Sequence, residues 1–536
     1  MTESSLPQPW TGDDYDCGFP VTLIPELSMV AASNAIREKP NWWQKYKDPT
    51  IVERWKREII SISGRRGGGY ALNDAQVEYI FKELDWYAQR RQDQVDRGVE
   101  APIEEGIDGI RRADGLVPQE LKQRLMACVE KLKDIPDHLK DWHPGSNMQV
   151  LDLVHPSLFP LIAGRTLVTD KDALPPMDFI GQGKVLEKAP RSGDVDSQYC
   201  SEEYQWLPTD FDVGPEGKVK IKSYINNLHP IEHKEMYPVL EEIFEKFLPM
   251  FEEVLADMRG FSRKKPRLRV DAYDWYESPS DDLDDDGYDE YYENRVFKPL
   301  IIPEFVPREE RQKYELTGKP LQVIVKLANI ELTPENPKYK GGTWHVEGMA
   351  NENIVASGIY YYHTENISES RLNFRIQVSE PDYEQSDDRG CGFMYQLAND
   401  EPLVQYLDGV NTNPDRCIAF PNIYQHQVQP FELEDPTKPG SRCILVYFLI
   451  DPERPVLSTT RVPPQQKDWA LPQGLLQEVA RKMPPEIFAQ IDKLVDWPID
   501  LEEAKMHREK LMKERKYFVK SMNETVFERP FSLCEH

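Results

Sequence analysis

The chain has 536 residues, of which 39% are hydrophobic, 10% aromatic and 29% charged, as in an ordinary globular protein. This length is sufficient for one large core or for two to three smaller ones. The formal net charge of −28 at pH 7 would repel a phosphate backbone, so nucleic acid is not expected as a partner.

Cysteines and apolar runs indicate the compartment. The seven cysteines are dispersed and form no CxxC pair, which argues against a disulfide framework and against a zinc site. The first 14 residues are polar and acidic and lack a secretory signal pattern. No stretch approaches the roughly 18 uninterrupted apolar residues of a membrane span. We therefore expect a cytoplasmic protein without membrane association.

The N-terminal part of the chain is predicted to be mainly helical. Apolar residues recur at helical spacing in Arg37–Ile60 and in Asn73–Val95. Asn73 is a predicted N-cap, and Gln76 completes a capping-box pattern. The glycine-rich stretch at 64–70 lacks the Lys-Ser/Thr of a phosphate loop, so we interpret it as a flexible turn.

Two further segments precede the predicted sheet. Residues Pro230–Met258 are predicted to form another helix, because their apolar residues follow the helical period. The acidic run Ser278–Arg295, with its interleaved tyrosines, is interpreted as a solvated loop. A lid over a cationic substrate is the alternative interpretation of this run.

From Leu321 onward the apolar period changes to that of strands. Apolar and polar residues alternate in Leu321–Ile330 and in Arg371–Val378, which gives each strand one apolar face. β-Branched and aromatic residues predict further strands in "NIVASGIYYY", "RCIAF" and "RCILVYFLI". Short strands separated by Gly, Pro and Asn loops are typical of a barrel or jelly roll.

The C-terminal part is predicted to return to helix after the proline-rich connector Glu453–Pro464, with Asp500 and Glu503 forming a capping box. We therefore divide the chain into three parts. A mainly helical region (1–200) packs on a core with a helical insert (201–455), and C-terminal helices follow (456–536).

Pairs of the type His-x-Asp/Glu are candidate metal ligands. On a strand, residues i and i+2 point the same way, so both can bind one ion. The tripeptide alone is weak evidence, since more than one is expected by chance among 10 histidines and 93 acidic residues. The chain contains four such pairs, His233/Glu235, His345/Glu347, His363/Glu365 and His507/Glu509.

The context of these pairs favours one of them. His507 and His233 lie in predicted helices, where residues i and i+2 diverge by about 200°. His363 ends a predicted strand and enters a polar turn. His345 follows a glycine pair, which allows the chain a close approach just before the ligand strand. We therefore predict His345 and Glu347 as metal ligands.

A third ligand is expected from a later strand. His426 lies in an alternating, β-rich segment downstream of the first two ligands. Sixteen residues further on, Arg442 opens the next predicted strand. A buried guanidinium there would pair with a carboxylate through two hydrogen bonds, as a dicarboxylate co-substrate requires. The alternative interpretation is a core histidine and a surface arginine.

Five longer strings between Glu38 and Pro452 are specific enough to compare with known families: "KPNWWQKYKDPTIVERWKREI", "VHPSLFPLIAGRT", "SYINNLHP", "GGTWHVEGMANENIVASGIYYYHTENI" and "LNFRIQV". They resemble the fungal family catalogued as domain of unknown function 4246. The resemblance implies an α+β fold with a double-stranded β-helix (jelly-roll) core and extensive helical decoration. It also implies Fe(II)/2-oxoglutarate chemistry, but it implies no particular substrate.

The wider Fe(II)/2-oxoglutarate-dependent oxygenase superfamily has the pattern His-x-Asp/Glu, a distant His, then Arg or Lys. That pattern carries over onto His345, Glu347, His426 and Arg442 of this sequence. Glu in place of the commoner Asp is a departure that lengthens the carboxylate arm. A second departure is Ile444, which stands where a Ser or Thr is usual. The hydroxyl partner of the co-substrate is therefore expected elsewhere, among the tyrosines at 360–362.

The resulting hypothesis is a dioxygenase that needs Fe(II) and 2-oxoglutarate and uses O2 to oxidise a small metabolite. Catalytic and metal-binding roles fall to His345, Glu347 and His426, and Arg442 binds 2-oxoglutarate. Two alternatives stay open, namely a cupin-type metalloenzyme independent of 2-oxoglutarate and a non-catalytic binding protein with the oxygenase fold. The oligomeric state is not predicted.

The hypothesis also makes geometric predictions. The barrel should consist mainly of Leu321–Ile450, with the helices packed outside it. The ring nitrogens of His345 and His426 should lie within about 5 Å of each other, because metal–nitrogen bonds are about 2 Å long. Trp344 should point into the core, and Arg375 should face either the cavity or the solvent.

Overall fold

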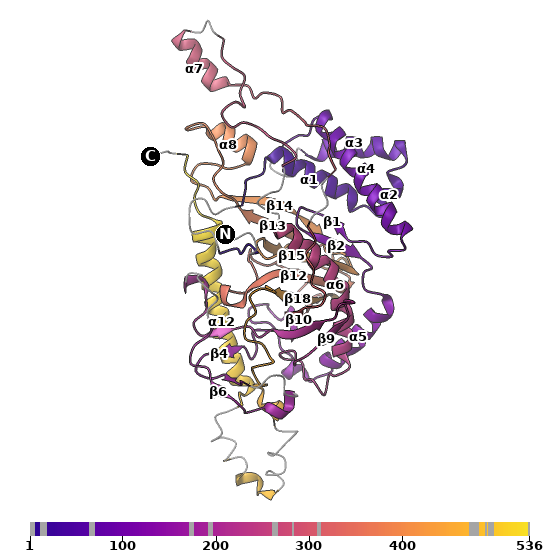
Figure 1. Ribbon diagram of the computed structural model, residues 1–536, viewed down its shortest axis with the longest axis vertical. Coiled ribbons are helices and arrows are strands. Elements are labelled where there is room, and N and C mark those ends of the chain that lie inside the picture. The colour runs from indigo at the N-terminus through magenta and orange to yellow at the C-terminus, as the bar shows by residue number, and fades with distance from the viewer. Residues whose placement is uncertain are drawn as a thin grey trace.

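Residues that alternate between apolar and polar in the second half of the chain form the strands of two antiparallel sheets. The computed structural model describes residues 6–10, 19–63, 70–170, 176–190, 197–259, 266–280, 284–307, 312–470, 482–487, 490 and 498–533. Within these ranges the protein is mixed α/β, with the sheets in the middle and helices around them (Figure 1).

The larger sheet contains nine strands of the described residues, and neighbouring strands run antiparallel. The order across it is β1 (Glu104–Glu105), β2 (Arg111–Asp114), β15 (Arg416–Pro421), β12 (Ile354–Glu365), β18 (Gly440–Ile450), β10 (Pro320–Leu332), β8 (Thr209–Val213) and β9 (Val219–Ile221), and β3 (Val150–Val154) also pairs with β10. The three long central strands, β12, β18 and β10, coincide with predicted strands.

The smaller sheet consists of β14 (Val404–Asn411), β13 (Arg371–Gln377) and β16 (Gln425–Val428). An isolated bridge between His345 and His426 adds the segment before β12 to the free edge of β16. Along the chain, the strands from β10 to β18, apart from the β11–β17 pair, therefore switch from one sheet to the other at each step except between β13 and β14, which both belong to the smaller sheet. β10, β12, β15 and β18 belong to the larger sheet, while the His345 segment, β13, β14 and β16 belong to the smaller one.

Short strand pairs connect the remaining loops. They are β4 (Leu161–Ile162) with β7 (Tyr204–Gln205), β5 (Leu167–Val168) with β6 (Lys184–Val185), and β11 (Lys338–Tyr339) with β17 (Phe431–Glu432). The β11–β17 pair joins the segment that leads to His345 to the chain that follows β16.

One face of the larger sheet is turned toward the smaller sheet. Phe420, Ser357, Phe448 and Ile324 are successive partners in one row across β15, β12, β18 and β10. Directly paired residues point to the same side of a sheet. The ring centroid of Phe420 lies 4.9 Å from that of His426 in the smaller sheet. The whole row therefore lies on the inward face.

The outward face of the larger sheet is covered by α6 (Met236–Arg259). Tyr447 of β18 donates a hydrogen bond of 2.8 Å to the carbonyl of Leu240, and its ring lies 5.2 Å from that of Phe244. The rest of the apolar side of α6 is buried as well. This burial explains why the helix stays regular around Pro249, although proline removes one backbone hydrogen bond.

Gly358 of β12 lies at the closest approach of α6 to the sheet. A Cβ atom at this position would lie 2.8 Å from atoms of both Phe247 and Phe251, whose rings are fully buried. Gly358→Ala should therefore destabilise the protein by about 1–3 kcal/mol, the usual cost of overpacking a core. Urea unfolding followed by circular dichroism measures the change.

Gly392→Ala in α8 (Asp388–Tyr395) is the matched control. Its Cβ would meet no atom closer than 3.9 Å, and alanine is the better helix former, so stability should stay equal or rise by up to about 1 kcal/mol. Equal unfolding midpoints for the two variants would contradict the crowding at Gly358.

The N-terminal helices partly follow the predictions. They are α1 (Ile24–Arg37), α2 (Trp42–Lys45), α3 (Pro49–Ser63), α4 (Asp74–Asp96) and α5 (Gln119–Lys133). The capping box of Asn73 and Gln76 at α4 is confirmed. The segment Arg37–Ile60, predicted to be helical, is divided among the end of α1, α2 and α3. The first break occurs because Pro40 disfavours helix in the preceding residue and Asn41 adopts a left-handed φ of 55°. The predicted turn at 64–70 lies almost wholly outside the described residues.

The N-terminal 200 residues also contain strands β1–β6. β2 pairs with β15, and β3 pairs with β10, so this part of the chain contributes directly to the larger sheet. Its helices α1, α3 and α4 lie together at one side of the molecule (Figure 1).

Helices later in the chain differ from the prediction in their limits. α6 begins at Met236, after a turn, and not at Pro230. The acidic run predicted as a loop contains α7 (Asp285–Asn294), because Asp284 caps the helix by accepting a 2.9 Å hydrogen bond from the amide of Gly287. α7 projects away from the sheets (Figure 1).

The C-terminal part contains α9 (Lys467–Ala470), α12 (Leu501–Met522) and the π-helical turn η6 (Asn523–Phe527). Short 3-10 helices occur earlier in the chain, namely η1 (Asp137–Leu139), η2 (Pro176–Phe179), η3 (Ser197–Tyr199) and η5 (Ala350–Glu352). Asp500 caps α12, as predicted. Among the described helices, none combines the length and the apolar character needed to cross a lipid bilayer.

Candidate metal centre

Backbone pairing brings the segment around His345 against β16. His345 and His426 lie directly opposite each other, with hydrogen bonds of 3.3 and 3.0 Å between their amides and carbonyls. Gly341 has a φ of 85°, and a Cβ there would lie 2.7 Å from the carbonyl oxygen of Val428. Only glycine fits this approach, which is the role that the sequence predicted for the glycine pair.

The three predicted ligands lie together. Nε2 of His345 is 3.8 Å and Nε2 of His426 is 3.3 Å from the same carboxylate oxygen, Oε1 of Glu347. The potential ligand atoms of the three side chains all lie within 4.8 Å of one another, within the limit expected above for the two ring nitrogens. The His426 side chain is 5% exposed and that of His345 is 32% exposed, so the cluster is open on the His345 side.

Hydrogen bonds orient two of the three ligands. Nδ1 of His345 lies 2.7 Å from the Thr343 carbonyl, to which it donates, and this leaves Nε2 with a free lone pair. The side chain of Asn422 accepts from the amide of Glu347 at 2.8 Å and donates to its carbonyl at 2.9 Å. Nδ1 of His426 is buried and has no hydrogen-bond partner among the described residues.

The electrostatics keep the carboxylate ionised. Burial would raise the pKa of Glu347, but the two neighbouring imidazoles lower it well below its ordinary value. Burial would lower the pKa of His345, but Glu347 and the Thr343 carbonyl raise it. The pKa of His426 is lowered by burial and by His345. One anionic oxygen ligand thus stands beside two imidazole nitrogens, a donor set that suits divalent transition metals.

Arg442 is buried, and no carboxylate among the residues that the structure describes pairs with it. It is 2% exposed, and it lies on the inward face of β18, because it is an even number of residues from Phe448 in a regular strand. Its Nη1 donates to Oγ of Ser370 at 2.8 Å, while Nε has no partner among the described residues. The guanidinium also lies 4.9 Å from the ring centroid of Phe431. Burial lowers the pKa of Arg442.

The other His-x-Glu pairs do not form three-residue clusters within the described part of the chain. His363 lies 3.6 Å from Glu365 at the end of β12, and no third ligand joins them. His507 lies in α12, as predicted, with Nδ1 3.0 Å from the Tyr204 hydroxyl. His233 lies in the turn before α6, so its predicted helical position is wrong.

Two expectations about neighbouring residues are wrong. Arg375 faces neither cavity nor solvent, because it donates to Gln425 at 2.6 Å and pairs with Glu528 at 2.7 Å. Trp344 is only partly buried. The guanidinium carbon of Arg375 lies over its indole ring, 4.9 Å from the ring centroid of Trp344. Arg375 therefore connects the smaller sheet to the C-terminal segment, while Trp344 packs against Arg375 and Tyr406 of that sheet.

Sequence reasoning missed a second polar cluster, His143, Asp152 and His155, whose potential ligand atoms also lie within 4.8 Å of one another. Asp152 is on β3, which pairs with β10. These residues do not form a His-x-Glu pair, and nine residues separate the first two, so the tripeptide search could not find them.

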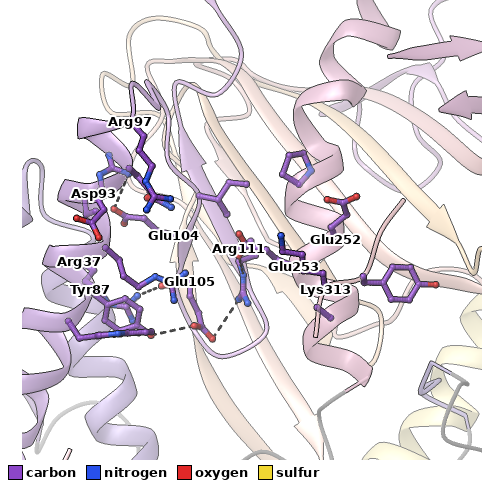
Figure 2. Close-up of a pocket in the computed structure, with 18 of the residues that line it drawn as sticks. Arg37, Tyr87, Asp93, Arg97, Glu104, Glu105, Arg111, Glu252, Glu253 and Lys313 are labelled. Carbon is purple, nitrogen blue, oxygen red and sulfur yellow. Dashed lines mark hydrogen bonds and ion pairs between the residues drawn. The ribbon is translucent and has the colours of Figure 1, made fainter. Parts of the chain in front are cut away.

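A pocket of about 890 Å³ lies away from these residues, between α4, β1 and α6. Figure 2 shows Arg111 between Glu105 and Glu253 in its wall. Arg111 pairs with Glu253 at 2.7 Å and with Asp257 at 2.5 Å, and Arg91 pairs with Glu104 at 3.4 Å. These arginines of the pocket wall are thus paired with carboxylates of the protein and are not available to bind an anionic ligand.

The profile of a family described as "Protein of unknown function (DUF4246)" matches residues 74–473, and that of its N-terminal domain matches residues 1–58. No curated protein matches the chain.

Solved structures are similar only weakly. A protein called IDO from Bacillus thuringiensis is 11% identical, over 25% of this chain and 46% of its own, with a TM-score of 0.16. TqaL, an Fe(II)/α-ketoglutarate-dependent dioxygenase, is 12% identical over 47% of this chain and 66% of TqaL, with a TM-score of 0.20. The dioxygenase for auxin oxidation in rice is 10% identical over 68% of this chain and 80% of the rice protein, with a TM-score of 0.24. The chain thus spans less than two thirds of the first two proteins, and similarities this weak do not establish a common fold.

Proposed function

We propose that this chain, which belongs to the family described as "Protein of unknown function (DUF4246)", is a non-haem oxygenase that uses Fe(II) and 2-oxoglutarate. The observation that carries the proposal is the cluster of His345, Glu347 and His426. Arg442 lies on the inward face of β18. The proposed substrate is a small organic molecule, oxidised with O2.

The strand order supports a double-stranded β-helix core. In that fold, eight strands form two facing sheets, and the chain switches sheet at every step except between the fourth and fifth strands. From β10 to β18, with the His345 segment counted as a strand and the β11–β17 pair left aside, this chain has eight segments in that order, and β13 and β14 are the fourth and fifth. The contact of Phe420 with His426 places the inward faces of the two sheets against each other. The TM-scores above contribute nothing to this proposal.

The residues fit Fe(II). Two imidazoles and one carboxylate on one side of an ion form the facial set of non-haem Fe(II) oxygenases, which leaves positions open for co-substrate and O2. The Thr343 carbonyl fixes His345 with Nε2 available, and the open side beside His345 gives access for a substrate.

Arg442 fits a dicarboxylate. A buried guanidinium with an unpartnered Nε is costly unless an anion joins it. The distal carboxylate of 2-oxoglutarate would accept hydrogen bonds from the Arg442 guanidinium, which Ser370 orients by accepting from its Nη1. The Ser370 hydroxyl itself is hydrogen-bonded to Thr412. Tyr361, whose ring centroid lies 5.4 Å from the guanidinium, is the candidate for the hydroxyl that was expected among the tyrosines. Tyr360 and Tyr362 are poor candidates for this hydroxyl, because they donate to Asp415 and to Asn329.

When bound, iron and 2-oxoglutarate supply O2 activation. With both bound, the site would couple oxidative decarboxylation of 2-oxoglutarate by O2, to succinate and CO2, with oxidation of a C–H bond of the substrate. The chain's part is to hold the metal through three side chains, to fix the dicarboxylate at Arg442 and to exclude water with the aromatic residues of the inward face.

Succinate release tests the proposal. Anaerobic protein with Fe(II) and 2-oxoglutarate, when exposed to O2, should form succinate slowly even without its substrate, and faster with the substrate present in a metabolite extract. Glu347→Ala should form none, whereas Glu365→Ala, which removes the carboxylate of another His-x-Glu pair, should match the wild type. Absence of succinate in both conditions would favour a metalloenzyme independent of 2-oxoglutarate.

A further inference from the structure

Lys326 of β10 lies on the inward face of the larger sheet. It pairs with Val446, two residues along each strand from the pair Ile324–Phe448, with no irregularity between them. Side chains two residues apart on a strand point to the same face. The row of Phe448 includes Phe420, which contacts the ring of His426. Lys326 therefore faces the proposed metal centre.

The Lys326 side chain has no partner of its own. It is partly exposed, and the described residues provide it with no hydrogen bond and no carboxylate within ion-pair distance. The positive charge of Lys326 lowers the pKa of His345 and of His426, although burial and the groups nearer to these rings have larger effects. The same ammonium acts on the pKa of Asp152 and of His155. The strand register agrees with this, because Ala328, two residues along β10 from Lys326, is the partner of Asp152 on β3.

The second cluster fits a metal ion poorly. The amide of Ser157 points at Nδ1 of His155 at 3.2 Å, which places the proton of this neutral ring on Nε2 and removes the lone pair that a metal needs. The cations Lys326 and Arg508 also act on His155. Asp152 is 5% exposed and accepts from His143 at 2.7 Å. The cluster therefore supplies a buried carboxylate that attracts Lys326 without pairing with it.

We propose that Lys326 binds an anionic group of the substrate, so that the substrate of this site is an organic carboxylic acid. The inference rests on the proposed function. Lys326 and Arg442 both face the interior, and they serve different anions. Arg442 pairs with Ile330, four residues along β10 from Lys326, a separation of about 13 Å between backbones. One carboxylate held by Arg442 therefore leaves Lys326 free for a second anion near the metal.

The test uses Mn²⁺ in the metal site, since it accepts the same ligands, and saturating 2-oxoglutarate at Arg442. Nuclear magnetic relaxation of butyrate protons then reports binding beside the paramagnetic ion, and uncharged butyramide is the matched probe. Butyrate should relax faster than butyramide with the wild type. Lys326→Met, which keeps the length of the side chain, should weaken butyrate binding roughly ten-fold. Lys218→Met, at a 74% exposed lysine of the outer strands, should bind as the wild type does.

The outcomes separate the two proposals. Wild type that takes up Mn²⁺ and 2-oxoglutarate but relaxes butyrate no faster than butyramide overturns the subsite and leaves the proposed function intact. Equal butyrate binding by Lys326→Met does the same. A weaker 2-oxoglutarate affinity in Lys326→Met would assign the lysine to the co-substrate and also overturn the subsite. Failure of the wild type to bind Mn²⁺ overturns both.

Discussion

Replacing His345, Glu347 or His426 by alanine should each weaken Fe(II) binding by more than about 100-fold. Loss of a residue that merely orients a metal ligand typically costs 10- to 100-fold in affinity, and loss of one of only three protein ligands costs more. Glu347→Ala should have the largest effect, because it removes the one anion that both imidazoles share. Anaerobic titration with Fe(II), followed by metal analysis after desalting, measures the affinities.

His363→Ala and His233→Ala are the matched controls. His363 is also part of a His-x-Glu pair on a strand, with a distance of 3.6 Å to its carboxylate, but no third ligand lies near. His233 lies in a turn. Both variants should bind one Fe(II) as tightly as the wild type. Loss of iron in His363→Ala together with retention in His426→Ala would refute the assignment of the ligands.

Local pattern was sufficient to predict strands of both sheets around the site. The alternation around Leu321 and Leu372 predicted β10 and β13, and each strand has one face against the other sheet. The His-x-Glu spacing predicted two neighbouring side chains on a strand. They do lie together, but His345 forms only an isolated bridge and Glu347 lies in a bend. The glycine before His345 was informative because only glycine tolerates both a positive φ and a backbone oxygen 2.7 Å from its Cβ position.

Contacts between residues distant in sequence could not be predicted this way. Asn422 holds Glu347 across 75 residues, and Ser370 meets Arg442 across 72. No spacing rule links such residues, since the sheet register brings them together. Arg375 failed as a cavity candidate because its partner, Glu528, comes from the C-terminal segment, which single-strand periodicity does not register.

Arg442→Gln should leave Fe(II) binding unchanged and weaken 2-oxoglutarate binding roughly 30- to several-thousand-fold. The metal ligands do not involve Arg442, whereas a carboxylate that loses a charge-assisted, two-pronged contact in a desolvated pocket loses about 2–5 kcal/mol. Calorimetric titration of the Mn²⁺-loaded protein with 2-oxoglutarate measures both effects separately. The apo stability of the variant should rise or stay equal, because a buried, unpaired guanidinium has been removed.

Two further variants decide how Arg442 acts. Arg442→Lys should fall between the wild type and Arg442→Gln, because a single ammonium cannot reproduce the planar fork of a guanidinium. Ser370→Ala should cost no more than about ten-fold, since it removes one hydrogen bond that Arg442 donates to a neutral hydroxyl and leaves the guanidinium in place for the co-substrate. If Arg442→Gln keeps its affinity for 2-oxoglutarate, the clamp must be another cation. Lys326 is then the candidate, because Arg375 is already held by Gln425 and Glu528. The anion that we propose for Lys326 would in that case be the co-substrate and not the substrate.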